Sequence, residues 1–308
     1  MSDIQHTGKG IVVKSTGSWY TVRTDNGDCI ACRLKGRLRT EGIKSTSPVV
    51  VGDRVLLEGD MICDIEPRKN YLIRKATKLS KHSHIIAANV DMAFLVVTFR
   101  LPETPVEFVD RFLVAAEAYR IPVCLVFNKI DLFSSEEWLV MKQFEDIYRT
   151  IGYQTIETSV VGLSGIDELR QMFAGKVSVV AGLSGVGKSS LINAMDSGLQ
   201  ARVGDMSDYH HSGKHTTTFA EMYRIEGGGY IIDTPGIRGF GLIHVGKEEI
   251  YHFFPEIFQV SAGCTYYNCR HVNEPGCAVM EAVETGKISE SRYRSYLSMM
   301  EDSQRKYR

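Results

Sequence analysis

Several features are absent from this 308-residue sequence, and each absence excludes a class of protein. No apolar run approaches the roughly 18 residues that a membrane-spanning helix needs. The first residues, Met1 to Gly10, are polar and lack the apolar segment of a secretory signal. We find no internal repeat and no low-complexity tract. With 44% hydrophobic and 24% charged residues, the composition is that of a folded globular chain. At about 150 residues per domain, the length predicts two or three domains.

The sequence also lacks an overall charge of either sign. Its 36 Lys plus Arg against 37 Asp plus Glu give a net charge of −1, which excludes a globally basic protein that coats nucleic acid. The balance is uneven along the chain. Residues 1–81 hold 15 Lys plus Arg and 9 Asp plus Glu, a charge of +6, whereas residues 82–308 carry −7. A basic N-terminal segment is therefore joined to an acidic remainder.

The seven cysteines are an odd number and follow no signal sequence, which predicts a reducing, cytoplasmic environment. There, clustered cysteines bind metal more often than they form disulfides. Cys29 and Cys32 have no second pair nearby, and we interpret them as strand residues. A C-x4-C-x-H-x5-C pattern near the C-terminus supplies three thiolates and one imidazole, enough to close a tetrahedral, structural zinc site; the alternative is three unrelated thiols beside a histidine. Its ligands are Cys264, Cys269, His271 and Cys277.

The N-terminal segment, residues 9–75, contains short β segments separated by Gly, Asp and Asn turns. About five strands in this length predict a small OB-fold-like barrel; an SH3-like barrel or a sandwich is the alternative. Four cations follow at every second position, which in an extended chain places them on one side, where they can follow a phosphate backbone. The alternative is a charged strand edge that opposes aggregation. These RNA-contact candidates are Arg33, Lys35, Arg37 and Arg39.

From about residue 85, apolar strands alternate with amphipathic helices. This pattern predicts a mostly parallel sheet with helices on both faces. The Ser164 and Asp167 spacing suggests that Ser164 caps the helix of residues 166–173. The expected strands are 90–98, 122–127, 153–157 and 176–181, and the expected helices are 109–119, 136–150 and 166–173.

The C-terminal part, from about residue 245, reads as helices around the Cys/His pattern. We expect helices at 248–254 and 277–284 and a last helix capped by Ser289. In that helix Tyr293, Tyr296, Leu297 and Met300 share a face and are expected to pack in the core. The whole chain is thus predicted to be multidomain: an OB-fold-like RNA-binding domain (1–78), an α/β nucleotide-binding domain (79–244) and a helical zinc-binding domain (245–308).

The residues after the strand 176–181 match the phosphate-loop pattern G-x-x-x-x-G-K-[ST] and lead into a helix, which is the context that the pattern requires. Backbone N–H groups of such a loop cradle phosphates. Lys188 would contact the β- and γ-phosphates, and Ser189 would bind Mg²⁺. The alternative is a chance match in a Gly-rich turn. The predicted binding residues are Gly182, Leu183, Ser184, Gly185, Val186, Gly187, Lys188, Ser189 and Ser190.

A second nucleotide motif, N-K-I-D, follows the strand 122–127. The Asp131 carboxylate can accept hydrogen bonds from guanine N1–H and N2–H₂, whereas adenine offers no such donors. Alone the motif is weak, and its alternative is an Asn/Asp turn; with the phosphate loop it predicts GTP and GDP as ligands. Asn128 and Lys129 belong to the same motif. Thr158 and Ser159 follow the next strand, where a second guanine-contacting loop is expected.

The motif D-T-P-G follows another short apolar strand. Asp233 is expected to hold Mg²⁺ through water, and the Gly236 N–H to sense the γ-phosphate. The polar segment 203–218 precedes that strand and ends G-K-H-T-T-T. It has the composition of a switch that closes over the γ-phosphate. One of the threonines 216–218 would bind Mg²⁺, and the sequence does not distinguish among them.

The order of these motifs is permuted relative to Ras-like GTPases, because N-K-I-D precedes the phosphate loop and D-T-P-G. Together with the β-rich N-terminal segment and the Cys/His pattern, this order resembles the ribosome small-subunit-dependent GTPase A family (RsgA, also called YjeQ or YloQ) along essentially the whole chain. The resemblance implies an OB-fold, a circularly permuted GTPase domain and a zinc-binding domain. It also implies a partner, the small (30S) ribosomal subunit with its 16S rRNA, a role in late maturation of that subunit, and GTP hydrolysis that the subunit stimulates.

The resemblance also bears on catalysis. Ile237 follows Gly236 where Ras-like enzymes carry a glutamine, and an aliphatic side chain cannot orient water. The family offers His215 as the replacement; the alternative is that His215 only shapes its loop. We expect a monomer without membrane contact that couples GTP hydrolysis to its release from the subunit. Two rival functions are a stand-alone ATPase, which Asp131 disfavours, and an RNA-binding protein with a vestigial nucleotide site, which the intact Lys188 and Ser189 disfavour.

Overall fold

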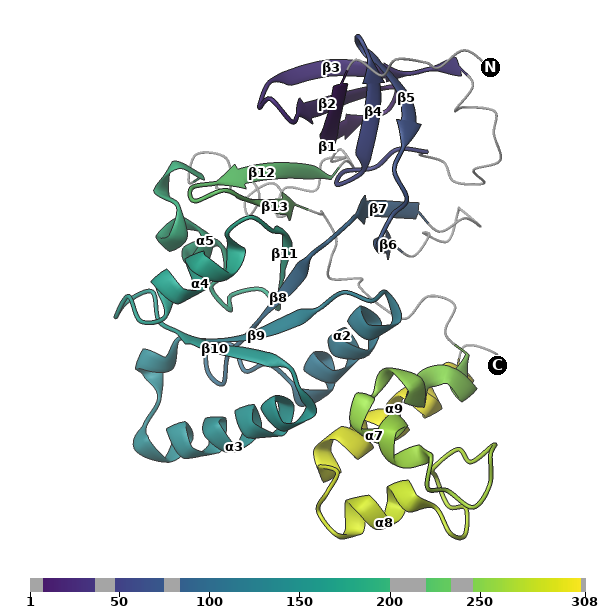
Figure 1. The fold of residues 1–308 in the computed structure, drawn as a ribbon. Coiled ribbons are helices and arrows are strands. Elements are labelled where there is room, and N and C mark those ends of the chain that lie inside the picture. The colour runs from purple at the N-terminus through teal and green to yellow at the C-terminus, as the bar shows by residue number, and fades with distance from the viewer. Residues whose placement is uncertain (1–7, 37–47, 75–83, 200–219, 234–245, 306–308) are drawn as a thin grey trace.

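A computed structural model of the chain describes residues 8–36, 48–74, 84–199, 220–233 and 246–305. Its first unit is a five-stranded barrel at the N-terminus (Figure 1). The strands β1 to β5 pair in the order β1-β2-β3-β5-β4, and β4 returns to β1 and closes the barrel. This closed arrangement is OB-like, as predicted. The strands are β1 (Gly8–Thr16), β2 (Trp19–Thr24), β3 (Cys29–Leu34), β4 (Arg54–Glu58) and β5 (Met61–Ile65).

Alternation of side chains along these strands builds the barrel core. Val12, Tyr20, Val22 and Cys32 are buried inside, while Trp19 and Cys29 face outward. Cys32 is therefore a packing residue of a strand, as the sequence indicated. Burial raises the pKa of its thiol to about 11.

A six-stranded sheet forms the centre of the molecule. Its order is β10-β9-β8-β11-β13-β12, in which the first five strands are parallel and β12 is antiparallel. Every residue of β8 and β9 is buried, which explains why both segments are apolar almost throughout. The strands are β8 (Met92–Val97), β9 (Val123–Asn128), β10 (Gln154–Thr158), β11 (Val177–Ala181), β12 (Glu221–Ile225) and β13 (Gly229–Asp233).

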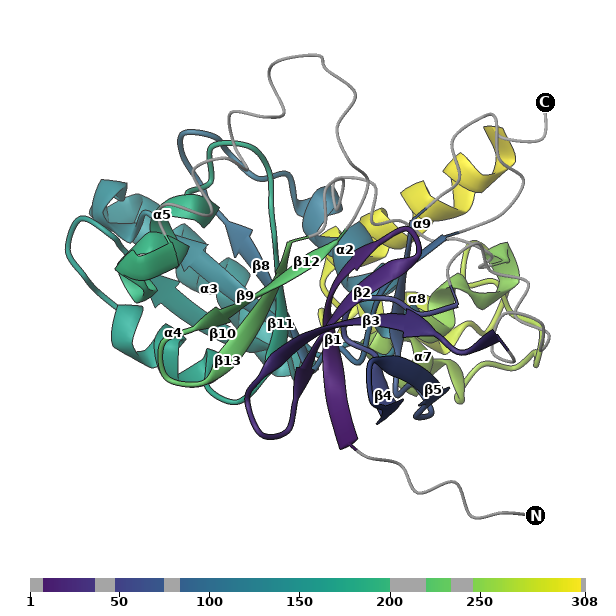
Figure 2. The same ribbon diagram turned by 90° about the horizontal axis from the view of Figure 1, so that it is seen from above.

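Helices cover both faces of this sheet (Figures 1 and 2). One apolar cluster packs α2 (Val106–Ala118) and α3 (Ser135–Ile151) against one face, and a second packs α4 (Ile166–Phe173) and α5 (Lys188–Met195) against the other. Two short 3-10 helices, η1 (Ile130–Leu132) and η2 (Ser197–Leu199), lie in the connections. The predicted mostly parallel sheet with helices on both faces is confirmed.

The helix starts show one wrong prediction. Ser134 and Glu137 form a capping box at α3, whereas α4 has Gly165 at its N-cap and no side-chain cap. Gly165 has φ +68°, and a Cβ there would lie 2.0 Å from the Glu157 carbonyl oxygen. Only glycine fits this turn. The expected cap residue, Ser164, instead accepts the backbone N–H of Ser159 through its carbonyl oxygen at 3.0 Å.

The barrel and the central sheet are joined edge to edge. Lys14 of β1 is the register partner of Glu221 of β12, and their side chains form an ion pair at 3.0 Å. Ile11 and Val13, on the outside of the barrel, pack against the core of the central sheet. A small hairpin, β6 (Tyr71–Arg74) with β7 (His84–Ala88), links the two units in the chain.

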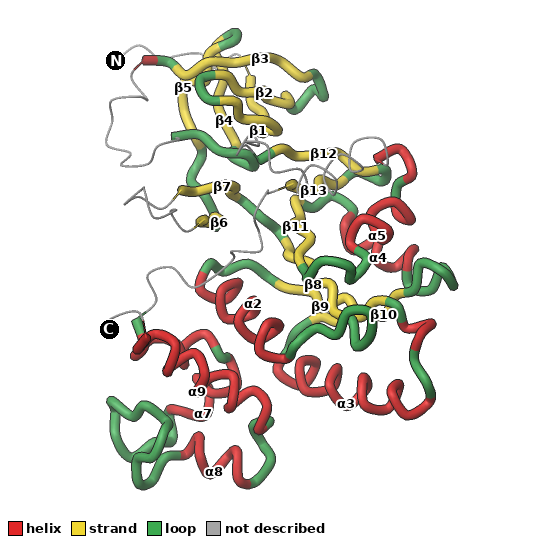
Figure 3. Tube along the Cα trace, turned by 180° about the vertical axis from the view of Figure 1, so that it is seen from behind, coloured by secondary structure: helices red, strands yellow, loops and turns green. Residues whose placement is uncertain are grey.

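The C-terminal block is helical and packs beside α2 (Figure 3). The sequence predicted one helix near residues 248–254, but this segment is a 3-10 helix, η4 (Lys247–Phe253), followed by a helix that the sequence did not indicate, α7 (Pro255–Ser261). Then come α8 (Ala278–Glu284) and α9 (Glu290–Arg305). The expected face of α9, with Tyr296 and Met300 buried and Tyr293 and Leu297 half-buried, packs in this core, as predicted. None of the helices in the described ranges combines the length and the apolar character that crossing a membrane requires.

Candidate nucleotide and metal sites

The phosphate-loop sequence lies between the end of β11 and the start of α5. Gly182, Gly185 and Gly187 all have positive φ, at +141°, +85° and +97°. A Cβ on Gly182 would lie 2.6 Å from the Val96 carbonyl oxygen, so glycine is needed where the loop leaves the sheet. The Lys188 ammonium donates to the carbonyl oxygens of Gly182 at 2.9 Å and Leu183 at 2.6 Å. The loop thus curls around the lysine at the N-terminus of a helix, where backbone N–H groups favour an anion.

The N-K-I-D segment holds this loop from the neighbouring strand. Asn128, at the end of β9, donates from Nδ2 to the Val186 carbonyl oxygen at 2.9 Å, and Lys129 Nζ donates to that of Gly185 at 2.7 Å. A Cβ on Gly187 would lie 2.5 Å from Asn128 Nδ2, so this contact also requires glycine. The two motifs, far apart in sequence and in permuted order, therefore form one structure.

Asp131, Thr158 and Ser159 also meet at this edge of the sheet. Ser159 Oγ donates to Asp131 Oδ1 in a short hydrogen bond, and Thr158 Oγ1 donates to Asn128 Oδ1 at 3.0 Å. Thr158 and Ser159 are buried, whereas Asp131 is exposed. Thr158, the last residue of β10, thus orients Asn128, and Ser159, the first residue after β10, orients Asp131.

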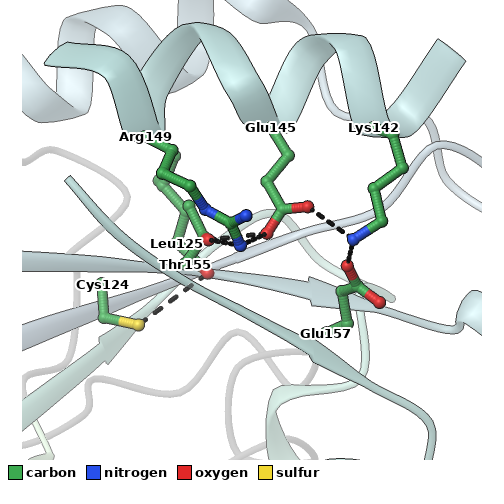
Figure 4. Close-up of polar contacts among 7 residues, drawn as sticks. All are labelled: Cys124, Leu125, Lys142, Glu145, Arg149, Thr155 and Glu157. Atoms are coloured by element: carbon green, nitrogen blue, oxygen red, sulfur yellow. Dashed lines mark hydrogen bonds and ion pairs between the residues drawn. The ribbon is translucent and has the colours of Figure 1, made fainter. Parts of the chain in front are cut away.

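A buried carboxylate, which the sequence did not reveal, fixes β10 against α3 (Figure 4). Glu145 is 1% exposed; Thr155 Oγ1 donates to it at 2.6 Å, and Lys142 and Arg149 pair with it at 3.0 and 2.9 Å. Lys142 also pairs with Glu157. Burial alone would raise the pKa of Glu145, but Thr155 and Lys142 outweigh it and lower the pKa below its ordinary value. The network positions the strand that ends in Thr158.

The remaining predicted switch residues cannot be placed. Asp233 ends β13, and its side chain lies outside the described part of the structure. His215, threonines 216–218 and Gly236 also fall outside the described residues. Among the RNA-contact candidates, Arg37 and Arg39 lie outside them as well.

The two remaining RNA-contact candidates already have partners on the barrel. Arg33 lies over the Trp19 ring, with its guanidinium carbon 3.9 Å from the ring centroid. Lys35 pairs with Glu58 at 2.5 Å. The described half of the expected stripe therefore presents one cation on an aromatic ring and one that is paired with a carboxylate.

The four predicted metal ligands converge between α7 and α8. Their ligand atoms all lie within 4.8 Å of one another. Cys264 Sγ is 3.5 Å from His271 Nδ1 and 4.0 Å from Cys277 Sγ, and Cys277 Sγ is 3.5 Å from His271 Nδ1. Tetrahedral bonds of about 2.3 Å to sulfur and 2.0 Å to nitrogen give separations of this size. The geometry can hold one metal ion.

The chemistry of the cluster also fits a cation. Burial raises the pKa of Cys269 to about 12, so this thiolate requires a nearby positive charge. Burial lowers the pKa of His271, which keeps the imidazole neutral and able to ligate through Nδ1. Nδ1 is the nitrogen that faces the sulfur atoms of Cys264 and Cys277, so it is the ligand atom, whereas Nε2 is buried and has no hydrogen-bond partner among the described residues.

The loop that carries His271 is held by Glu274, which the sequence did not reveal, and by two tyrosines from the expected core face of α9. Glu274 accepts backbone N–H groups of Arg270 at 3.0 Å and Val272 at 2.9 Å. Burial would raise the pKa of Glu274, but these N–H groups lower it to about 2. Tyr293 and Tyr296 of α9 donate to the carbonyl oxygens of His271 at 2.8 Å and Arg270 at 2.6 Å. These contacts stabilise the positive φ of +57° at His271.

A buried ion-pair network fixes the C-terminal block to the central domain. Arg292 of α9 and Asp110 of α2 are both fully buried, and their side chains meet at 2.7 Å. Arg292 also contacts Glu256 of α7 at 2.7 Å and lies over the Phe254 ring, and Tyr148 of α3 donates to Asp110 at 2.8 Å. Burial alone would lower the pKa of Arg292, but the two carboxylates raise it above its ordinary value.

This arrangement defines a class of protein. A phosphate loop after β11, clamped by an N-K-x-D segment that precedes it in the chain, belongs to a circularly permuted P-loop GTPase, here with an OB-like barrel before it and a Cys/His metal cluster after it. A family model described as "RsgA GTPase" matches residues 65–243, and one described as "RsgA N-terminal domain" matches residues 9–61. The chain therefore belongs to the RsgA GTPase family, whose members hydrolyse GTP.

Individual relatives agree with this assignment. "Small ribosomal subunit biogenesis GTPase RsgA 2" of Bacteroides thetaiotaomicron is 54% identical over 306 residues, covering 97% of this chain and 99% of the relative. The Bacteroides fragilis protein named "Small ribosomal subunit biogenesis GTPase RsgA" is 53% identical with the same coverage. The crystal structure of YjeQ from Thermotoga maritima superposes with a TM-score of 0.80 at 37% identity, covering 96% of this chain and 98% of that one. YloQ, described as a circularly permuted GTPase, gives 0.76 at 28% identity, covering 99% of each chain.

Proposed function

We propose that this protein is a GTPase that binds the small ribosomal subunit during its late maturation, hydrolyses GTP faster on the subunit, and leaves it after hydrolysis. One observation carries the proposal: relatives named for small-subunit biogenesis are about half identical over 97% of the chain. The phosphate loop and the N-K-I-D segment, which contact each other at one edge of the sheet, support the GTP-binding part of it. The part of the subunit that we expect this protein to contact is its 16S rRNA. We expect the protein to act as a monomer in the cytoplasm.

In the proposed nucleotide site, backbone N–H groups of residues 182–190 bind the phosphates, and Lys188 contacts the β- and γ-phosphates. Asp131 accepts from the guanine edge, and the contacts of Thr158 and Ser159 keep Asn128 and Asp131 in position. Ser189 and Asp233 would hold Mg²⁺, which neutralises charge that develops on the phosphates. Gly236 would sense the γ-phosphate. The ties from Asn128 and Lys129 to the loop support these roles.

For the hydrolytic step we propose His215 as the residue that orients the attacking water, because Ile237 stands where Ras-like enzymes carry glutamine. Turnover of a His215→Ala variant tests this role. We expect subunit-stimulated kcat to fall by about 10²-fold or more with a smaller change in KM. Unchanged stimulated turnover would refute the assignment.

We propose that the metal in the Cys/His cluster is a structural Zn²⁺. Three thiolates and one imidazole are its preferred ligands, and four protein ligands leave no open position for a substrate. The ion would stabilise the loop 262–277, which carries little apolar core of its own. In this scheme, residues 1–78 and 245–308 contact rRNA, with Arg33, Lys35, Arg37 and Arg39 as the barrel's candidates. Residues 79–244 form the GTPase domain.

The deciding experiment measures GTP turnover with and without purified small subunits, together with co-sedimentation in GTP, in GDP and in a non-hydrolysable GTP analogue. We expect higher turnover with subunits and stronger co-sedimentation with the analogue than with GDP. A matched control is the phosphate-loop variant Lys188→Ala, which should lose turnover in both conditions. If the wild-type chain showed neither stimulation nor nucleotide-dependent co-sedimentation, the ribosomal role would be wrong.

A further inference from the structure

A cleft of about 670 Å³ lies between the barrel and the central sheet. Arg23 and the turn after β2 form one wall, and Val177 and Tyr230, at the beginnings of β11 and β13, form the other. The nucleotide motifs follow the opposite ends of these strands. The cleft is therefore separate from the proposed GTP site.

The wall of the cleft continues as an exposed surface along β2. Tyr20 and Val22 point into the barrel core, so Trp19, Thr21 and Arg23 share the outer face. On the adjacent strand β1, the outer face is already occupied, because Ile11 and Val13 pack on the central sheet. The outer face of β2 is thus the barrel surface next to the contact between the barrel and the central sheet, and it is not covered by that contact.

The carboxylates that line the cleft have basic partners. Arg54 pairs with Asp25 at 3.1 Å and Glu66 at 3.6 Å, and Lys69 lies 3.8 Å from Asp91. These pairs offset one another's charge. The charge of the ligand that the cleft attracts is therefore set by the cations that are not in these pairs.

Those remaining cations are Arg23 and Arg224, and neither forms an ion pair with a described residue. Arg23 is half-buried and Arg224, on β12, is exposed. Ile11 of β1 is the register partner of Arg23 and also lines the cleft. Two guanidinium groups thus serve one cleft, together with the phenol ring of Tyr230. Guanidinium groups bind phosphate, and flat rings stack on bases.

An aromatic platform lies at the other end of the same outer face. Trp19 is 42% exposed, and the Arg33 guanidinium covers one side of its ring. The residues between the platform and the cleft, Thr21 and Ala31, are small and paired with each other. Arg23 lies four positions after Trp19 along β2, a span of about 13 Å at about 3.3 Å per residue.

We propose that this cleft and the outer face of β2 bind one strand of single-stranded RNA. Arg23 and Arg224 bind phosphates, and the free side of Trp19 stacks on a base. A strand is favoured over a free nucleotide because the binding groups extend about 13 Å beyond the cleft along β2. The inference rests on the proposed function, which supplies RNA as the partner, and it specifies where one strand lies.

The test measures binding of a fluorescently labelled oligouridylate of about eight nucleotides by anisotropy over a range of salt concentrations. We expect Arg23→Ala and Arg224→Ala each to weaken binding by about 5- to 20-fold at low salt and to reduce the salt slope by about 0.7. Arg23→Lys and Arg224→Lys should retain most of the slope. The control is Arg120→Ala, an exposed arginine outside the cleft with no ion pair to a described residue.

A second measurement follows Trp19 directly. The sequence has two tryptophans, so Trp138→Phe leaves Trp19 as the single one. Stacking should quench its emission when the oligomer binds, with uridine monophosphate far less effective at equal phosphate concentration. The proposal would be wrong if Arg23→Ala and Arg224→Ala bound the oligomer as tightly as Arg120→Ala does. It would also be wrong if uridine monophosphate bound as tightly as the oligomer.

Stimulation of GTP turnover by small subunits, measured on the wild-type chain, separates the two proposals. Its absence contradicts the proposed function. If stimulation is present but oligonucleotide binding is unaltered in both alanine variants, only the proposed RNA site in the cleft is contradicted.

Discussion

Replacing Arg292 tests whether the buried ion-pair network holds the helical block on the GTPase domain. Arg292→Met keeps most of the side-chain volume and removes the charge. It leaves the carboxylates of Asp110 and Glu256, which were each 2.7 Å from the guanidinium, without their cationic partner. Asp110 is fully buried, so bulk solvent does not reach its carboxylate, and its Oδ2 has no hydrogen-bond partner among the described residues.

The expected loss follows from this burial. Removing one partner of a buried ion pair costs about 3–5 kcal/mol, because the other charge stays desolvated. Tyr148 still donates to Asp110, which places the expected loss for Arg292→Met near the lower end, about 3 kcal/mol. A triple variant, Asp110→Asn, Glu256→Gln and Arg292→Met, has no unpaired charge. It should recover at least half of that loss.

Urea unfolding of the zinc-loaded protein measures these differences, with far-UV circular dichroism for the helices and, in a Trp19→Phe background, the fluorescence of Trp138 on α3 for the central domain. Arg294→Met is the matched control, because Arg294 lies on the same helix, is 74% exposed and pairs with Glu290. Exposed pairs contribute about 0–1 kcal/mol, so this variant should resemble the wild type. If Arg292→Met lay within about 0.5 kcal/mol of Arg294→Met, or if the triple variant were no more stable than the single one, the reasoning would be refuted.

Three further predictions concern the sites. The pKa of Glu145 is lowered in the folded chain, so its carboxylate stabilises the fold above the ordinary carboxyl pKa and loses this contribution as the pH falls through the folded value. Glu145→Gln should therefore cost about 1–3 kcal/mol at pH 7 and less near pH 4, measured by urea unfolding at both pH values; a constant difference would contradict this. Cys277→Ser should lower bound zinc, measured by elemental analysis, from one ion per chain towards zero, whereas Cys63→Ser, outside the cluster, should retain it. Asp131→Ala should weaken GTP binding by about 10²-fold without affecting ATP, measured by competition; equal losses for both nucleotides would exclude a guanine contact.

The parts of the fold that the sequence predicted well are those with a local physical signal. The apolar run 122–127 gave β9, because a strand buried on both faces has no polar positions. The helix 166–173 matched α4 at both ends. The phosphate-loop glycines have the positive φ values that their motif requires. In each case a short stretch of chain carries the whole constraint.

The parts that the sequence did not reveal depend on distant residues. Arg292 and Asp110 are 182 positions apart, and neither position has a local pattern that marks it as buried. The wrong cap at Ser164 has the same origin, since the choice of Gly165 depends on the Glu157 carbonyl that lies against it. The helix α7 was missed because Pro255 resembles a helix end, whereas here it occupies the first turn, where a missing N–H costs nothing.

The topology also indicates how one nucleotide site could affect the two separate units that we propose contact RNA. The barrel is joined to β12, which directly follows the expected switch segment, and β12 pairs with β13, which ends where D-T-P-G begins. The helical block is instead fixed to α2 through Arg292 and Asp110. A rearrangement at the γ-phosphate would therefore reach the barrel through β12 while α2 holds the helical block. Because the two units attach to different elements of one domain, a movement of β12 relative to α2 changes the spacing between the surfaces proposed to contact rRNA. Such a change in spacing is a physical route from hydrolysis to release.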